Sequence, residues 1–330
     1  MVNRRSVIAG LGTMLGAACG ALPLRRAAAA TAFPARPVTV IVPFAAGGST
    51  DVIARAVAEA MRGPLGQPVV VENRSGAGGA LGTAQVAKAA PDGYTIGMGS
   101  ASTLAINPAA YRSLPFDVAK DLAPVGAVAV VPNIMTINPK IKVGSISEFI
   151  ALARTHKGRF SYGSSGNGSV SHLLGAQFNL ATQADLQHVP YRGIGPALND
   201  AVAGRVDVLF DNLPTSLPMV LAGRLRPLAV SGETRLAILP KVPTFAEVNL
   251  DELGWMGFFG LVAPAATPAP IIARLNAALR AALAQPELRN RLAAQQATVA
   301  GGSPEQFGAD IRRALTQMRR ATHAAGISIE

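Results

Sequence analysis

The sequence contains little cysteine, few aromatic residues and few charged residues. Its 330 residues include one cysteine, Cys19, and aromatic and charged residues make up 5% and 15% of the chain. A single thiol excludes a disulfide framework and a cysteine-based metal centre, and the four histidines form no H-E-x-x-H motif. No basic run longer than two residues is interleaved with aromatic residues, so nothing indicates nucleic-acid binding. We expect no metal, no cofactor and no nucleic-acid partner.

Residues 1–32 are predicted to be an export signal. Arg4 and Arg5 precede an apolar stretch rich in glycine and alanine, and small residues follow it. This order is typical of a secretory signal that is cleaved near Ala30 or Ala32. The alternatives are an uncleaved membrane anchor, twin-arginine export and lipidation at Cys19. We expect a periplasmic location, reached through a cleavable signal.

The chain after the signal is basic and lacks long apolar runs. The formal charge falls from +11 to +7 because four arginines precede Phe33, and a positive charge favours anionic small molecules in a general way. No later apolar run approaches the length of about 18 residues that a membrane span needs. We therefore expect a soluble mature chain that acts as a monomer.

Strand-like and helix-like segments alternate from Val38 onward. The strand-like runs are continuously apolar, as in sheets that helices cover on both faces, and several of the predicted helices begin at Ser, Thr or Pro. The predicted strands are 38–43, 69–72, 95–99, 125–137, 160–163, 187–189, 206–210 and 225–231. The predicted helices are 49–61, 81–89, 147–154, 170–180, 196–203, 268–284 and 304–325. This order predicts an α/β fold with doubly wound, largely parallel sheets.

The last seventy residues are expected to be helical and to lack strands. These helices must then pack on a sheet formed by an earlier part of the chain. This implies that the chain leaves a first lobe and later returns to it. We place lobe 1 at residues 33–133 plus 258–330 and lobe 2 at residues 134–257, joined by a hinge. Ligands of α/β proteins often lie between such units, at the carboxyl ends of strands.

The stretch Val40–Met61 reads VIVPFAAGGSTDVIARAVAEAM and combines a buried strand, two glycines and a helix start. Ser49 or Thr50 could cap the helix, and Asp51 would lie in its first turn. Because glycine allows close backbone approach, the free N–H groups of Gly48 and its neighbours could hold an anion. The alternative is a tight strand-to-helix turn with no ligand. A bulky residue at Gly48 would then distinguish the two readings.

Comparable turns follow later strands. The stretch YGSSGNGSVSH, residues 162–172, again leads from a strand into a helix. Tyr191 and Arg192 follow another strand, and Arg192 could pair with an acid, although a surface position is common for arginine. The GAGG stretch at residues 76–79 lacks the dinucleotide-binding spacing, and we interpret it as structural.

A hydrolase is the catalytic alternative. The sequence has no G-x-S-x-G elbow and no P-loop. A nucleophile could still be assembled in space from Ser164 or Ser165 with His172 and Asp211. Such an enzyme would be a secreted serine hydrolase.

Several motifs in order resemble the Bug family of extracytoplasmic solute receptors, which are related to the TctC component of tripartite tricarboxylate transporters. They include RPVTVIVPFAAGGSTD, VVVENRSGAGG, AAPDGYT, SLPFDVAKDLAPV, YGSSGNGSVSH, VPYRG and VPTFAE. The resemblance covers nearly all of residues 33–329. It implies a type II periplasmic binding protein fold, no enzymatic activity, and a small carboxylate bound between two lobes.

The resemblance also implies which residues contact the ligand. In lobe 1 these are Phe44, Gly47, Gly48, Ser49 and Asp51, with Ser100 and Ser102 behind them. In lobe 2 they are Ser164, Ser165, Asn167, His172, Tyr191, Arg192, Asp211 and Asn212. Ala45 and Ala46 replace residues that are often bulkier in the family, so the size of the pocket and the identity of the acid stay open. Membrane subunits of a tripartite transporter are the expected partners, and a signalling partner is the alternative.

Overall fold

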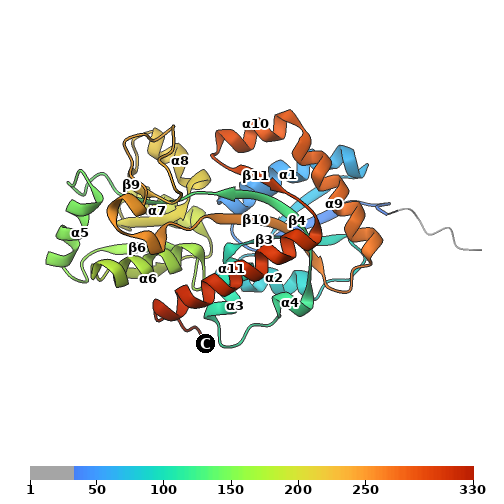
Figure 1. Cartoon of the computed structure of the whole chain (residues 1–330), viewed down its shortest axis with the longest axis horizontal. Helices are drawn as coiled ribbons and strands as arrows, with labels where there is room; N and C mark the ends of the chain where they lie inside the picture. The colour runs from blue at the N-terminus through green and yellow to red at the C-terminus, as the bar shows by residue number, and fades with distance from the viewer. Residues whose placement is uncertain (1–32) are drawn as a thin grey trace, which may run out of the picture. The chain divides into compact units, whose positions relative to one another are not determined.

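The computed structural model describes residues 33–330, which form one compact unit. The predicted export signal and Cys19 lie outside the described residues. Strands and helices alternate along the chain and build two separate sheets (Figure 1). Among residues 33–330, no helix combines the length and apolarity needed to cross a membrane.

The first sheet has six strands in the order β11-β4-β10-β3-β1-β2. Its strands are β1 (Val38–Val42), β2 (Val69–Asn73), β3 (Thr95–Ser100), β4 (Leu122–Val131), β10 (Gly257–Pro264) and β11 (Thr298–Gly301). β1 pairs in parallel with β2 and β3, whereas β10 runs antiparallel to β3 and β4, and β11 runs antiparallel to β4. The sheet is therefore mixed, because β10 and β11 enter it in the opposite direction.

Helices cover both faces of the first sheet. Helices α1, α9 and α10 pack on one face, and their side chains share a core with Val40, Met98 and Val128 of the strands. On the other face, α2 and the first half of α11 form a second core around Phe307. The bounds of these helices are α1 (Ser49–Leu65), α2 (Ala80–Ala87), α9 (Ala269–Ala284), α10 (Pro286–Ala294) and α11 (Pro304–Ala324). Short helices η1 (Ala77–Gly79), η2 (Ser102–Ile106), α3 (Asn107–Ala110) and α4 (Val118–Asp121) lie between them.

The second sheet has five strands in the order β7-β6-β8-β5-β9. Its strands are β5 (Asn133–Ile137), β6 (Ser161–Ser164), β7 (Gln187–Pro190), β8 (Val208–Asn212) and β9 (Arg226–Val230). β6 is parallel to β7 and β8, and β5 is antiparallel to β8 and β9. Helices α5 (Ile146–Thr155) and α6 (Val170–Thr182) share one core with this sheet, and α7 (Ile194–Ala203) and α8 (Leu213–Leu221) share another. Turns η3 (Ala246–Val248) and η4 (Asp251–Leu253) precede the return to β10.

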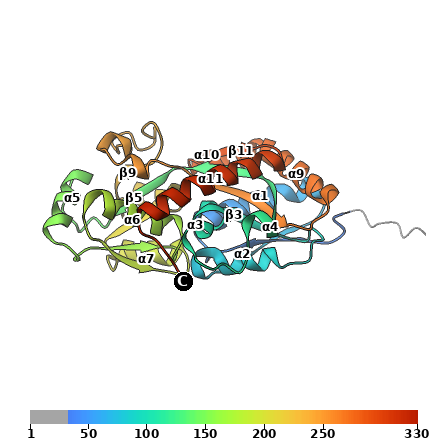
Figure 2. The same cartoon turned by 60° about the horizontal axis from the view of Figure 1, so that its bottom comes forward.

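Three segments connect the two sheets. The chain crosses at Pro132, between β4 and β5, and returns before β10. Helix α11 also spans both sheets in Figures 1 and 2, since Phe307 packs in a core of the first sheet and Met318 packs in a core of the second. The α/β prediction is confirmed. The lobe boundaries at 133/134 and 257/258 stay a proposal, and β5 and β10 begin one residue before them.

Some predicted elements are wrong. The run at residues 125–137 is not one strand, because Pro132 has no N–H for the ladder and separates β4 from β5 in different sheets. The last seventy residues do contain strands, namely the second half of β10 and all of β11. The sheets are mixed rather than largely parallel. Periodicity also overlooked α8 and α10, which begin at Leu213-Pro214 and Pro286.

Candidate ligand-binding site

The turn between β1 and α1 leaves the first amides of the helix uncovered. Gly48 is the N-cap and has no side chain to cap with, so neither Ser49 nor Thr50 takes the capping role that the sequence suggested. No acceptor among the described residues receives the N–H groups of Ser49, Thr50 and Asp51. The first turn of an α-helix cannot satisfy these donors internally, and its dipole adds partial positive charge there. The start of α1 is therefore suited to an anion.

Asp51 ties the turn down instead of facing the cavity. Its carboxylate accepts hydrogen bonds from the Gly47 N–H at 3.1 Å and from Asn73 Nδ2 at 2.9 Å, and it pairs with Arg55 at 3.0 Å. Burial by itself would raise the pKa of Asp51, but these hydrogen bonds outweigh it and hold the pKa below its ordinary value. Its negative charge is thus compensated within the loop, so it opposes an anion at the helix start less than its position in the sequence suggests.

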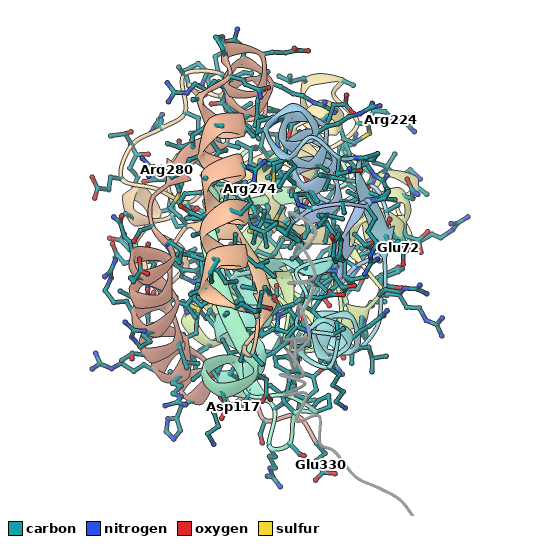
Figure 3. All side chains as sticks on the ribbon, turned by 90° about the vertical axis from the view of Figure 1, so that its right-hand side faces the viewer. Glu72, Asp117, Arg224, Arg274, Arg280 and Glu330 are labelled. Atoms are coloured by element: carbon teal, nitrogen blue, oxygen red, sulfur yellow. The ribbon has the colours of Figure 1, made fainter. Side chains whose placement is uncertain are left out.

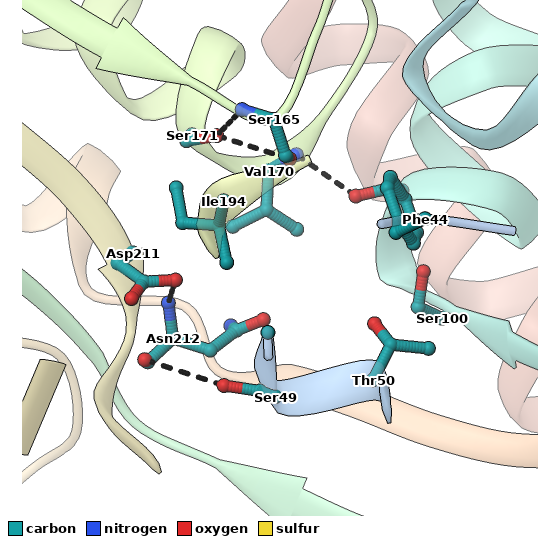
Figure 4. Close-up of a pocket in the computed structure, with 12 residues that line it drawn as sticks. Phe44, Ser49, Thr50, Ser100, Ser165, Val170, Ser171, Ile194, Asp211 and Asn212 are labelled. Atoms are coloured by element: carbon teal, nitrogen blue, oxygen red, sulfur yellow. Dashed lines mark hydrogen bonds between the residues drawn. The ribbon is translucent and has the colours of Figure 1, made fainter. Parts of the chain in front are cut away.

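Ser100, at the end of β3, contributes to the cavity a hydroxyl that forms no hydrogen bond with another described residue. Its side chain is 4% exposed, and its Oγ has no hydrogen-bond partner among the described residues. In Figure 4 this hydroxyl lies across from Thr50 at the edge of the same space as the start of α1. A buried hydroxyl without a partner costs free energy, and a ligand oxygen in the cavity would remove that cost.

The turn between β6 and α6 is different, because protein side chains already occupy its donors. Ser169 caps α6 and accepts from the His172 N–H at 3.3 Å. The Val170 N–H donates to Ser102 Oγ, at the start of η2 after β3 of the first sheet, at 3.0 Å. The Ser165 N–H donates to Ser171 Oγ at 2.9 Å. This second helix start therefore has fewer free amides than the first.

Both turns line one cavity (Figure 4), whose volume is about 30 Å³. That is room for about two water molecules. The lining includes eight of the residues predicted from the sequence, Phe44, Gly48, Ser49, Ser100, Ser102, Ser165, Asp211 and Asn212. It also includes four that were not predicted, Thr50, Val170, Ser171 and Ile194. Thr50, Val170 and Ser171 belong to the predicted turns, whereas Ile194 lies outside them, and nothing in the sequence identified this apolar residue as part of the site.

Seven predicted residues do not line the cavity. Gly47 and Asp51 hold the first turn together, as described above. Ser164 lies beneath the second turn and hydrogen-bonds His188 at 2.6 Å. Tyr191 donates to Asp200 at 2.8 Å, and the side chain of Arg192 is exposed. The last two, Asn167 and His172, have roles in closure and in packing.

Main-chain groups take part in most of the contacts between the two sides of the cavity. The Ala45 N–H donates to the Arg192 carbonyl at 3.4 Å, and Asn107 Nδ2 donates to the Gly168 carbonyl at 2.9 Å. A side chain at Gly78 would collide with the Asn167 carbonyl, since an added Cβ would lie 1.9 Å from that oxygen. Gly78 belongs to the GAGG stretch, so this stretch supports contact between the two sides.

Tyr111 and Ser49 add side-chain contacts across the same boundary. Tyr111 Oη donates to the Asn167 carbonyl at 3.2 Å, while Ser49 Oγ lies 2.5 Å from Thr215 Oγ1. The structure therefore represents a closed arrangement of the two sides.

His172 and His188 stack with ring centroids 4.2 Å apart and rings inclined by 12°. Burial lowers the pKa of both to about 4, and for His188 the neighbouring His172 contributes as well. Both rings are consequently neutral near pH 7. His172 Nδ1 accepts from the Gly168 N–H at 3.2 Å, so the pair supports the second turn from behind.

The proposed catalytic triad is not assembled. Ser165 Oγ contacts Ser171 Oγ at 3.3 Å, His172 is engaged with Gly168, and Asp211 binds Ser216 Oγ at 2.8 Å. No hydrogen bond joins any two of the three within residues 33–330. The same region contains no group of three His, Cys, Asp or Glu side chains that could hold a metal ion.

Comparisons with known proteins agree with this geometry. The model of the tripartite tricarboxylate transporter family receptor matches residues 53–325. Protein BugT of Bordetella pertussis is 39% identical over 92% of this chain and 93% of its own length. The structure of the periplasmic binding protein BugD superposes with a TM-score of 0.87 at 34% identity, covering 90% of this chain and all of BugD.

Two other similar structures contain carboxylates. MatC from Rhodopseudomonas palustris has bound malate, and it matches with a TM-score of 0.85 at 34% identity over 88% of this chain and 99% of MatC. R. palustris Rpa4515, solved with adipate, matches with a TM-score of 0.86 at 35% identity over 90% of this chain and all of that one. These likenesses confirm the two-lobed periplasmic binding protein fold. They also identify the protein as a solute receptor and not an enzyme, so the hydrolase alternative is dropped: the chain belongs to the TctC/Bug family of tripartite tricarboxylate transporter receptors.

Proposed function

We propose that this receptor binds a small organic carboxylate in the cavity between the lobes, through main-chain amides at the start of α1. One observation supports this more than any other: Ser49 and Thr50, whose N–H groups have no acceptor among the described residues, and Ser100, whose hydroxyl has no partner there, line the same cavity. A carboxylate would satisfy these donors and gain the attraction of the helix dipole. The adipate and malate in the two related structures support the same ligand class.

The ligand enters an open form and favours the closed one. The closed cavity of about 30 Å³ is too small to admit a dicarboxylate without rearrangement. Separation of the lobes would break the contacts of Asn107, Tyr111 and Ser49 with the second lobe. A ligand shifts such an equilibrium by as much as its contacts differ between the two states.

In the same proposal the mature protein is a periplasmic monomer, exported by residues 1–32, that delivers its ligand to the membrane subunits of a tripartite transporter. A sensor that presents the same closed form to a signalling protein is the second candidate. Capture of membrane components by the liganded receptor, compared with the free receptor, distinguishes the two partners.

A thermal-shift screen tests the ligand class. We expect malate, adipate or a related dicarboxylate to raise the melting temperature by mass action. The matched diamides should leave the melting temperature unchanged, because they lack the negative charge. If no mono-, di- or aromatic carboxylate stabilises the protein, or if the diamides do so equally, the proposed function is wrong.

Calorimetry on two variants tests the binding mode. Gly48→Leu should abolish binding, because even a Cβ at Gly48 would lie 2.8 Å from Ile194 Cγ2 inside the cavity. Gly63→Leu is the matched control, since Gly63 lies in the same helix and an added Cβ there meets nothing within 4 Å. Arg192→Ala should weaken binding by less than about threefold, as expected of an exposed side chain. A larger loss for Arg192→Ala than for Gly48→Leu would overturn main-chain recognition.

A further inference from the structure

The proposed anion site contains an acid and no base. Of the twelve residues that line the cavity in the described part of the chain, Asp211 alone has an ionisable side chain. Charged side chains such as Glu72, Asp117 and Arg224 lie at the periphery of the molecule instead (Figure 3). An anion in the cavity would therefore lie near a carboxyl group, with no lysine or arginine in the lining to compensate for it.

Asp211 is held firmly in this position. Its side chain is 4% exposed. One carboxyl oxygen accepts from the Asn212 N–H at 2.6 Å, and the other accepts from Ser216 Oγ at 2.8 Å. Burial raises the pKa of Asp211 to about 7, although the hydrogen bonds from Ser216, Asn212 and Thr215 oppose the rise. Both charge states of this carboxyl are accordingly accessible near neutral pH.

We propose that Asp211 must be a neutral carboxylic acid when the carboxylate ligand binds, so that binding takes up one proton. This inference rests on the proposed function, because it concerns the same cavity and the same ligand class. It makes Asp211 the residue that selects for ligand charge: the protonated site accepts an anion, and the ionised site rejects one.

The reason is electrostatic. Two like charges in one enclosed, poorly solvated space repel strongly, because the effective dielectric constant there is far below that of water. The amides at the start of α1 offset part of the negative charge of the ligand, and an ionised Asp211 would add a further negative charge that no group in the lining compensates. An ionised Asp211 therefore gains a proton as the anion enters, and its pKa in the complex is higher than in the free protein.

No other group near β8 changes its charge in the same pH range. His172 on α6 has a pKa of about 4 and is neutral above pH 6. Burial raises the pKa of Tyr162 on β6, which keeps its hydroxyl protonated. Asp200 on α7 is paired with Arg205, and hydrogen bonds from Arg205 and Tyr191 lower its pKa. Across the cavity, Asp51 is paired with Arg55 and its pKa is also lowered. The strand β5 and the helix α8, which also pack on β8, contain no charged residue.

Calorimetry across pH tests the proposal with malate and adipate, which are both fully ionised above pH 7. We expect the Kd to be constant below about pH 7 and to rise by at least tenfold between pH 7 and pH 9. Titrations at pH 8 in two buffers of different ionisation enthalpy, HEPES and Tris, should show uptake of close to one proton per ligand. This proton count uses the unaltered protein and does not depend on any variant.

Two variants locate the proton. Asp211→Asn should remove the pH dependence and bind more tightly than the unaltered protein at pH 9. Asp207→Asn is the matched control, because Asp207 immediately precedes β8, hydrogen-bonds Ser161 and does not line the cavity. It should retain the full pH dependence.

A Kd that stays constant from pH 6 to pH 9, or that falls as the pH rises, overturns the proposal. So does tighter binding of an amino acid than of the corresponding unsubstituted acid, since an ammonium group would pair with an ionised Asp211. These results require that a carboxylate binds at pH 6. If no carboxylate binds at pH 6, the proposed function is wrong, and the role proposed for Asp211, which depends on that function, is wrong as well.

Discussion

The two strand-to-helix turns that face the cavity look alike in the sequence and differ in the structure. Both follow a strand, contain glycine and serine, and open a helix. At α1 the N-cap is Gly48, and the first amides have no acceptor within residues 33–330. At α6, Ser169 caps the helix and Ser102 from the other lobe accepts the Val170 N–H. The first turn is therefore open to a ligand, whereas the second already makes the contacts of closure.

The free N–H groups at the start of a helix can therefore have two uses. Where a side chain of the other lobe accepts the hydrogen bond, as at α6, they hold the lobes together, and where no side chain does so, as at α1, they are available to a ligand. Ser102 and Val170 are separated by 68 residues, so no local pattern could indicate that they meet. The comparison predicts that changes at the first turn affect the ligand directly, while changes at the second turn act through closure and support.

The largest expected effect tests closure. Gly78→Val should weaken malate binding by about 100-fold or more, because an added Cβ would lie 1.9 Å from the Asn167 carbonyl in the closed form. The collision would favour the open form and so reduce the fraction of protein that can close. The apparent Kd rises in proportion, because it equals the intrinsic Kd divided by that fraction. Calorimetry measures the affinity, and small-angle X-ray scattering with saturating malate measures the closure.

Gly66→Val is the control for Gly78→Val. Gly66 also has a positive φ, 74° against 58° for Gly78, but a Cβ there meets nothing within 4 Å. It therefore introduces the backbone strain without the collision. Equal affinities for the two variants would show that the contact between Gly78 and Asn167 has no part in closure.

An intermediate effect separates the two turns. Ser100→Ala should weaken binding by about tenfold, because a hydrogen bond to a charged ligand contributes about 1.5–3 kcal/mol. It should not lower the Tm of the free protein, since Ser100 Oγ has no partner to lose. Ser102→Ala should weaken binding by only about threefold to fivefold, because it removes one neutral hydrogen bond of closure. The opposite order in calorimetry would assign ligand contact to the second turn.

The smallest expected effect concerns the support of the second turn. His172 and His188 have pKa values of about 4 in the folded protein and close to 6.5 when unfolded. The unfolded chain thus binds more protons between these values, so stability is fully present above pH 6.5 and declines as the pH falls toward 4. Calorimetric scans should show a Tm lower by a few degrees at pH 5 than at pH 7.

Replacing both buried histidines with glutamine should flatten this pH dependence. His323→Gln is the control, because His323 is exposed near the end of α11. The Tm of this control should depend on pH as in the unaltered protein. If the pH dependence of the Tm is flattened equally in the control, the stacked pair of His172 and His188 is not its cause.

The sequence was sufficient for most of the fold because apolar periodicity depends on local burial. The helices that begin at Ser49, Val170 and Pro304 were all predicted with their first residues correct. Elements whose signal is weak were missed: β11 is only four residues long, and α8 contains Pro214 and Pro218, which lower its apparent helical preference. The division at Pro132 depends on which sheet each half joins, and that is a tertiary property.

The candidate site was predictable only in part, for a related reason. Residues with small polar side chains at strand ends, such as Ser49, Ser100 and Asn212, do line the cavity. Ile194 could not be identified, because an apolar residue at a helix start resembles any core position. Arg192 stays a predicted ligand contact of secondary importance; its side chain is exposed in the structure, and its carbonyl group accepts the Ala45 N–H. Every residue has the same main-chain carbonyl group, so a contact through that group cannot be predicted from the residue type.

The main-chain contact at Gly78 and Asn167 has an evolutionary consequence. Because the two sides touch there through backbone atoms, this one contact of closure does not depend on the side chains that line the cavity. Substitutions at Thr50, Val170 or Ile194 could then change the preferred solute while the moving parts stay intact. Such a separation would let duplicated copies of one receptor diversify toward new nutrients by a few replacements each.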